Sequence, residues 1–283
     1  MPPINTQLMG IIAKMTFIAN MKQLPIDWKQ PGDQYKNAFK PEELVNPPSL
    51  PLPPHLFREA SLNKYHVDTA KTIGEQFASF IDKICPAIGF SIDMWRMQAK
   101  FKNIMINAVT ALGTPGCLDG PKIGSNIKNA PMMVGATDQE KKYCAAVADA
   151  LEDKWKKWQD NVMVPGLPWY PAFAAFPGPQ APPMPNVPTP LIACPSPMMS
   201  ELTPFPLKQA MCDALGEKDA LHHEELFDAI ATGFSMAFLV WLPMQQVMLV
   251  LGKGPVPTFA PPYVPVGPVI MGDIISVPGH LMM

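Results

Sequence analysis

The sequence predicts a mainly α-helical protein whose amphipathic and kinked helices are joined by long apolar segments rich in proline and glycine. Three observations lead to this prediction. Apolar residues recur at helical spacing in several parts of the chain. The 283 residues include 36 prolines, which gather between those parts. Because proline has no backbone N–H to donate, the proline-rich segments are expected to form neither helices nor central strands.

The first region, residues 1–54, is predicted to contain a short helix followed by a proline-rich arm. Within residues 4–23, apolar side chains recur at spacings of three and four. They are Ile4, Leu8, Ile11, Ile12, Met15 and Ile18. The arm contains the stretch NPPSLPLPPHL, a composition that favours the extended polyproline II conformation.

The second region, residues 55–164, is predicted to be helical. One helical stretch is expected from about Asp68 to Leu112, with a kink or break at Pro86. A second helix has the clearest start signal in the chain, because Thr137 and Glu140 have the spacing of a capping box. Its apolar stripe is expected to be buried, with lysines on the other side. The stripe consists of Tyr143, Val147, Leu151, Trp155, Trp158 and Val162.

The third region, residues 165–206, is predicted to be an extended apolar strap. Between residues 164 and 191 it contains no charged residue and many prolines. Exposing its large side chains to water would cost about 1.5–3 kcal/mol each, so the strap is expected to lie against another surface. Either this chain or a neighbouring subunit could supply that surface. The side chains predicted to make the contact are Trp169, Tyr170, Phe173, Phe176, Met184, Val187 and Leu191.

The fourth region, residues 207–283, is predicted to be a helical stretch to about Leu251 followed by a proline-rich tail. Similar short motifs suggest a weak repeat of a helix and a loop, three times over. Two helical regions share Pro-Met-Met followed by Cys and Asp-Ala-Leu. The loops share the patterns DGPKI, PTPLI and VGPVI.

The composition excludes several classes of function. The net charge is −2 and only 16% of the residues are charged, which argues against a nucleic-acid-binding protein. The number of cysteines is odd and none has C-x-x-C spacing, so neither a disulfide framework nor a zinc site is predicted. No phosphate-binding or nucleophile-elbow motif occurs. The sequence therefore predicts a protein that is not an enzyme and has no cofactor, catalytic residue or metal site.

Three motifs could carry chemistry but are better explained by structure. His222 and His223 lack the second histidine of H-E-x-x-H, so both are expected on the polar side of a helix. Cys117 lies in a turn-rich loop without an adjacent histidine to activate it. Trp155 and Trp158 lie between lysines, but their spacing places them on the apolar stripe of their helix.

An alternative interpretation is an integral membrane protein. Residues 229–251 are uncharged and just long enough to span a bilayer, although Gly233, Pro243 and two adjacent glutamines interrupt them. A buried helix in a large assembly fits this stretch about as well. The N-terminal sequence lacks the pattern of a signal peptide, so synthesis and assembly in the cytoplasm are expected.

The combination of low charge, long apolar arms and no signal peptide resembles minor virion or tail and baseplate proteins of tailed bacteriophages and of contractile injection machines. The resemblance is one of general composition and covers no specific motif. It implies a structural subunit of a virion or of another cytoplasm-assembled particle. Its partners would be other protein subunits, and the protein would be multimeric; contact with a membrane stays open.

Overall fold

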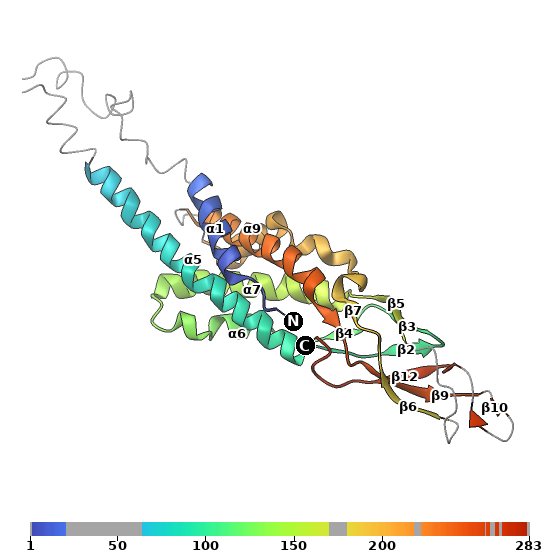
Figure 1. Ribbon diagram of the computed structural model, residues 1–283. Helices are drawn as coiled ribbons and strands as arrows, with labels where there is room; N and C mark the ends of the chain where they lie inside the picture. Colours follow the sequence, from blue (N-terminus) through green and yellow to red (C-terminus); the bar gives the residue numbers. More distant parts are fainter. Residues whose placement is uncertain are drawn as a thin grey trace, which may run out of the picture.

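The computed structural model describes residues 2–20, 64–169, 180–217, 222–257, 259–260, 264–265 and 268–281. Figure 1 shows an elongated molecule with a bundle of helices at one end and a β-sheet at the other. The long helices run along the same direction as the molecule. Both ends of the chain lie near the middle, where the helices meet the sheet.

Five helices of more than ten residues make up the described bundle. They are α1 (Thr6–Asn20), α5 (Lys64–Gln98), α7 (Asp138–Asp160), α8 (Pro204–Leu215) and α9 (His223–Trp241). The shorter helix α6 (Gly124–Lys128) lies between α5 and α7. Short 3-10 helices lead into or follow the longer ones: η3 (Pro131–Met133), η4 (Leu191–Ala193), η5 (Pro197–Leu202) and η6 (Leu242–Met244).

The predicted capped helix is confirmed as α7. The Thr137 hydroxyl accepts a hydrogen bond from the Glu140 backbone N–H, and the Glu140 carboxylate accepts one from the Thr137 N–H. All six side chains of the predicted apolar stripe are buried, whereas Lys141, Lys142 and Lys156 are exposed. Local signals determine this helix, because the cap and the stripe both lie within one short stretch of sequence.

The other end of the molecule is a six-stranded antiparallel sheet with strand order β5-β3-β2-β12-β9-β6. Its strands are β2 (Ile104–Asn107), β3 (Thr110–Gly113), β5 (Val164–Pro168), β6 (Gln180–Pro185), β9 (Leu251–Pro255) and β12 (Gly272–Ile275). Strands that are neighbours in space come from distant parts of the chain. For example, Gly272 of β12 pairs with Ile106 of β2.

The prediction of a mainly α-helical fold is therefore wrong. The helix expected to reach Leu112 ends at Gln98, and the chain continues as the β2–β3 hairpin. The predicted proline-rich tail supplies β9 and β12, two inner strands of the sheet. These strands are only four or five residues long, so they are too short to show clear alternation of apolar and polar residues.

The proline-rich strap also enters the sheet, because it contributes β5 and β6. Both are edge strands. The pairing of β5 with β3 shifts register near Pro165 and Gly166, and that of β6 with β9 shifts near Pro182 and Pro183. Proline is tolerated in a sheet at edges and bulges, where its missing N–H removes no inner hydrogen bond. The exclusion of proline from central positions of strands thus holds for these two segments, although their description as simple extended chain does not.

Two further predictions concern the helices. Of the kink or break expected at Pro86, the break is absent, because α5 continues through the proline. Buried Ile81, Ile84 and Ile88 hold the turns on both sides of the proline against the core. The proposed threefold repeat is not seen either. DGPKI leads from strand β4 (Leu118–Asp119) towards α6, PTPLI contains strand β7 (Thr189–Pro190), and VGPVI leads to β12.

Three two-stranded pairs complete the described structure. They are β1 (Lys100–Phe101) with β4, β7 with β8 (Gln246–Val247), and β10 (Phe259–Ala260) with β11 (Val264–Pro265). The β1–β4 and β7–β8 pairs lie where the bundle meets the sheet. At the same place, the Asn186 side chain donates to the carbonyl of Val247 and accepts from the N–H of Val250. These contacts join the two ends of the molecule.

Candidate interaction surface

The outer side of α1 carries large apolar side chains that the rest of the described structure leaves exposed. Ile11, Met15 and Ile18 have exposed fractions of 55%, 66% and 66%. They lie at helical spacing and form one stripe. Moving each such side chain from water into an apolar contact contributes about 1.5–3 kcal/mol. Contiguous exposed apolar side chains often mark a site of interaction.

The inner side of α1 is apolar as well. Met9, Ala13 and Phe17 are buried against α5 and α9. The helix begins where the Asn5 side chain accepts a hydrogen bond from the backbone N–H of Leu8, a typical N-cap contact. A helix that is apolar on two sides would be covered on two sides in its stable state. The described chain covers only one of them.

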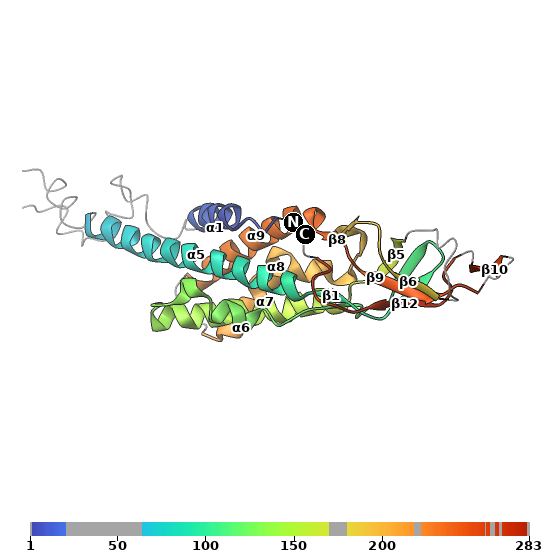
Figure 2. The same ribbon diagram turned by 60° about the horizontal axis from the view of Figure 1, so that its bottom comes forward.

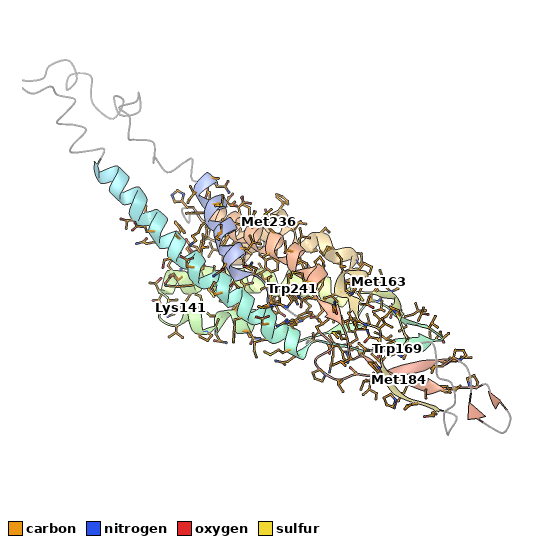
Figure 3. All side chains as sticks on the ribbon, in the orientation of Figure 1. Lys141, Met163, Trp169, Met184, Met236 and Trp241 are labelled. Atoms are coloured by element: carbon orange, nitrogen blue, oxygen red, sulfur yellow. The ribbon has the colours of Figure 1, made fainter. Side chains whose placement is uncertain are left out.

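The helix α9 presents a second exposed apolar stripe next to α1. Met236, Leu239 and Val240 have exposed fractions of 49%, 57% and 53%. Figure 3 shows Met236 on the outer side of the bundle, beside α1. We call the exposed side chains of the two helices the α1–α9 face. It consists of Ile11, Met15, Ile18, Met236, Leu239 and Val240.

Small residues bring α1 and α9 close together. A Cβ atom added at Gly233 would lie 2.6 Å from the Met9 carbonyl oxygen and 3.2 Å from the Ala13 Cβ atom, so only glycine fits. The helices run antiparallel. At one end the Asn20 side chain donates to Asp228 at 2.6 Å, and at the other the Gln245 side chain donates to the Pro2 carbonyl at 3.2 Å. The two exposed stripes therefore lie on helices that are neighbours in the bundle.

The α1–α9 face contains no charged residue. The one lysine of α1, Lys14, pairs with Asp82 of α5 at 2.7 Å. In contrast, α7 lies on the opposite side of the bundle from α1 (Figure 2) and carries many charges. Hydrogen bonds to Asp160 and Asp153 raise the pKa of Lys156 and Lys157, respectively. The bundle thus has one charged side and one uncharged, apolar side.

Among the described residues, one helical stretch is long and apolar enough to cross a membrane, His223–Met244. This stretch contains α9 and η6, and 67% of its most apolar part is buried inside the protein. The predicted span at residues 229–251 extends beyond it into β8 and β9.

The strap residues with a described position lie at the sheet and at the junction. Trp169 is buried on the sheet, where a Cβ atom added at Gly252 would collide with its ring and with Ile106 (Figure 3). Leu191 is buried in η4, while Met184 and Val187 are partly buried. Contacts within this chain account for the burial of Trp169 and Leu191. Tyr170, Phe173 and Phe176 lie outside the described residues.

The structure describes the surroundings of His223 and Cys117, two residues of the candidate chemical motifs. His223 is buried at the start of α9, its ring 6.2 Å from that of Phe227, although the sequence predicts it on the surface. Burial raises the pKa of Cys117 to about 11, and its thiol donates to the Val162 carbonyl. The described residues contain no group of three or more His, Cys, Asp or Glu able to hold a metal.

A cavity of about 460 Å³ lies between α1 and α5. Its lining includes Lys14, Asp82 and Cys85. Burial raises the pKa of Cys85 to about 12, which favours the protonated thiol at neutral pH. The cavity thus holds an ion pair next to apolar walls.

No known family, curated protein or solved structure matches the chain.

The sequence analysis missed the α1–α9 face because the apolar pattern of α1 does not show which side of the helix is buried. The stripe read from the sequence contains Ile11, Met15 and Ile18, which the fold leaves exposed. The buried residues Met9, Ala13 and Phe17 recur at spacings of four and form a second stripe. The helix has fifteen residues, two apolar stripes and one charged residue, Lys14. This pattern could have indicated that α1 is covered on two sides.

Proposed function

We propose that the protein is a non-enzymatic structural subunit of a large protein assembly, of the kind that builds virions or contractile tails. It binds neighbouring protein subunits through the α1–α9 face. The supporting observation is the group of six exposed apolar side chains, uninterrupted by charge, on two helices that pack side by side. The low charge of the whole chain, 16%, agrees with a protein that covers much of its surface with partners.

A protein partner fits this face better than a lipid surface. Helices that lie on membranes combine an apolar side with many Lys and Arg residues, which attract anionic lipids. The α1–α9 face has no such residue, and Lys14 beside it is paired with Asp82. The acidic Glu224, Glu225 and Asp228 lie at the N-terminal end of α9 instead.

A membrane span through α9 is the second candidate, because His223–Met244 is long and apolar enough to cross a membrane. The packing of α7 on α9 argues against it. Trp155 of α7 lies 5.6 Å from the ring of Phe238 of α9, and the exposed Lys156 and Lys157 follow Trp155 directly. A bilayer around α9 in this fold would place those charges at hydrocarbon depth, which is costly.

Charge introduced on the face tests the proposal. We expect Met15→Glu and Leu239→Glu each to convert associated protein to monomer, because a carboxylate in an apolar contact loses its water without gaining a partner. The mass in solution is measured by light scattering after size-exclusion chromatography, and circular dichroism checks the helices. Val134→Glu is the matched control, since Val134 is 83% exposed and lies away from the face.

Three results separate the alternatives. Association of the wild-type chain and of Val134→Glu, lost in both face variants, supports the proposal. A wild-type chain that stays monomeric at all concentrations contradicts it. Flotation of the wild-type chain with phosphatidylcholine vesicles, resistant to carbonate washing, would favour the membrane span instead.

A further inference from the structure

We propose that α1 is exchanged between copies of this chain, so that the α1 of one subunit packs on the α5 and α9 of another. This inference rests on the proposed role as a subunit of an assembly and names a partner for it: a second copy of the same chain. We call the surface of α5 and α9 that receives α1 the α1 seat. Exchange of one element between identical copies is a known, low-cost route to association.

The α1 seat is built only from parts of the chain that are far from α1 in sequence. Lys14 pairs with Asp82, 68 positions away, and Asn20 donates to Asp228, 208 positions away. The Pro2 carbonyl accepts hydrogen bonds from the side chains of Arg96 and Gln245. None of these contacts depends on the chain connection between α1 and the rest. The α1 of another copy can therefore make all of them.

The seat is also shaped for this helix. Besides Gly233 on α9, Gly89 on α5 gives room to α1, because a Cβ atom at position 89 would collide with the Thr6 side chain. Glycine on both walls lets α1 approach the two backbones closely. Only a segment that matches this shape and supplies Lys14 and Asn20 at the right places fits, and each copy of the chain carries one.

The connection from α1 to α5 is much longer than a local contact needs. The end of α1 and the start of α5 lie at the same end of the bundle, yet residues 21–63 separate them in sequence (Figure 1). Helix–helix connections in compact bundles usually have about 2–8 residues. At roughly 3.3 Å per residue, this connection can span up to ~140 Å. That reach is enough to place α1 on a neighbouring molecule.

The second apolar side of α1 points to the same arrangement. With its inner side in the seat of one subunit, α1 still exposes Ile11, Met15 and Ile18. An exchanged α1 lies where two copies meet, so its outer side can be covered there. Within one chain, the covalent link to the rest of the molecule keeps α1 at an effective concentration on the order of millimolar. Exchange with another copy therefore competes with packing of α1 inside its own chain when the copies are present at similar concentrations, as in an assembly.

Zero-length cross-linking of isotope-mixed protein tests the exchange. Equal amounts of ¹⁴N- and ¹⁵N-labelled full chain are unfolded together in urea and refolded at concentrations from about 10 µM to about 1 mM, the range around the effective concentration. A carbodiimide then joins Lys14 to Asp82, whose side chains lie 2.7 Å apart. The control pair is Lys83 and Glu140, 2.6 Å apart between α5 and α7. Mass spectrometry measures how often each cross-link joins different isotopes.

With exchange, the mixed-isotope share of the Lys14–Asp82 link rises with concentration towards one half, while the Lys83–Glu140 link stays within one isotope. A Lys14–Asp82 link that stays within one isotope at all concentrations overturns the exchange, even where light scattering shows oligomers, and then the assembly role stands without it. Equal mixing of both links also overturns it, because the whole bundle would then be rearranged. A chain that is monomeric throughout overturns both proposals.

Discussion

Trp155 is the side chain on which three helices meet. Its ring lies 4.9 Å from that of Trp95 of α5, 4.9 Å from Trp158 of α7 and 5.6 Å from Phe238 of α9. Trp95 is fixed in turn by a hydrogen bond from its indole N–H to the Gln159 side chain at 2.6 Å. Edge-to-face contacts between such rings contribute beyond the burial of their area. This cluster holds the bundle together at its centre.

We expect Trp155→Ala to lower the free energy of unfolding by about 3–5 kcal/mol, because it leaves a large cavity between α5, α7 and α9. Urea unfolding followed by circular dichroism measures the change. The neighbouring Lys156→Ala is the control, since Lys156 is exposed and should change the stability little. A loss below about 1 kcal/mol for Trp155→Ala would mean that the cluster does not hold the bundle together.

His280 is a buried histidine that belongs to none of the motifs found in the sequence. Its Nδ1 accepts a hydrogen bond from the Phe101 backbone N–H at 2.8 Å, and its ring stacks on that of Phe101. Burial lowers the pKa of His280 to about 4. Protonation of Nδ1 would break the bond to Phe101, because a protonated nitrogen cannot accept. The neutral form therefore belongs to the folded state.

We expect His280 to make the protein less stable in acid. Unfolded, His280 binds a proton below about pH 6.5, whereas in the folded protein it stays neutral until near pH 4. The unfolded state binds more protons in this window, so the free energy of unfolding falls as the pH is lowered from 6.5 towards 4. Urea unfolding at several pH values should show a smaller loss for His280→Gln, whose amide oxygen can still accept from Phe101. An identical pH dependence in both proteins would refute this assignment.

At the scale of elements, α7 could be predicted and the β2–β3 hairpin could not. The cap at Thr137 and the stripe of α7 are local patterns, so the sequence contains them in one stretch. The hairpin turns at Ala108 and Val109, with Ala108 in the left-handed region at φ 55°. Two-residue hairpin turns usually contain Gly, Asn or Asp at such positions, so this one gives no local signal. The contact with β12, far along the chain, favours a strand there.

The packing of α1 on α9 depends on Gly233. We expect Gly233→Ala to displace α1 and to lower the free energy of unfolding by about 1–3 kcal/mol, as for other overpacked contacts. The yield of the Lys14–Asp82 carbodiimide cross-link should fall with it. Gly10→Ala is the matched control, because a Cβ atom at position 10 meets nothing within 4 Å. If Gly233→Ala kept both the stability and the cross-link, the close approach of the two helices would not matter.

For the whole molecule, the sequence allowed the helical end to be recognised but not the sheet. The sheet joins segments from residues 104–113, 164–168, 180–185, 251–255 and 272–275, and no single window contains two partners except the hairpin. The same holds for the α1–α9 face, which exists only because residues 6–20 and 223–241 pack together. The predicted strap interface also depends on which segments pack beside the strap. Its aromatic residues Tyr170, Phe173 and Phe176 fall outside the described residues.

The two ends of the molecule are suited to different contacts with neighbours. The helical end has an open apolar face, whereas the sheet has proline on both edges, in β5 and β6. An edge strand with free N–H groups can pair with another molecule, and proline blocks this pairing. If the protein associates as we propose, its neighbours are therefore expected at the helices.

We expect the double variant Pro182→Thr and Pro183→Thr to aggregate on concentration, because it restores two backbone donors on the exposed edge strand β6. Static light scattering against time measures the aggregation. Pro131→Thr is the control, since this exposed proline begins the 3-10 helix η3 and lies in no sheet. Equal behaviour of both variants would show that the edge prolines do not protect the sheet.

The two ends of the chain lie close to each other at the junction of bundle and sheet. The Pro2 carbonyl is bound by Gln245, and the His280 carbonyl accepts from the backbone N–H of Met248, only three positions further on. The path of the backbone thus nearly closes into a ring at the junction of bundle and sheet. A short peptide joining the two ends would close it, and a circularly permuted chain could then begin in a surface loop. The same set of contacts would be encoded in a different linear order.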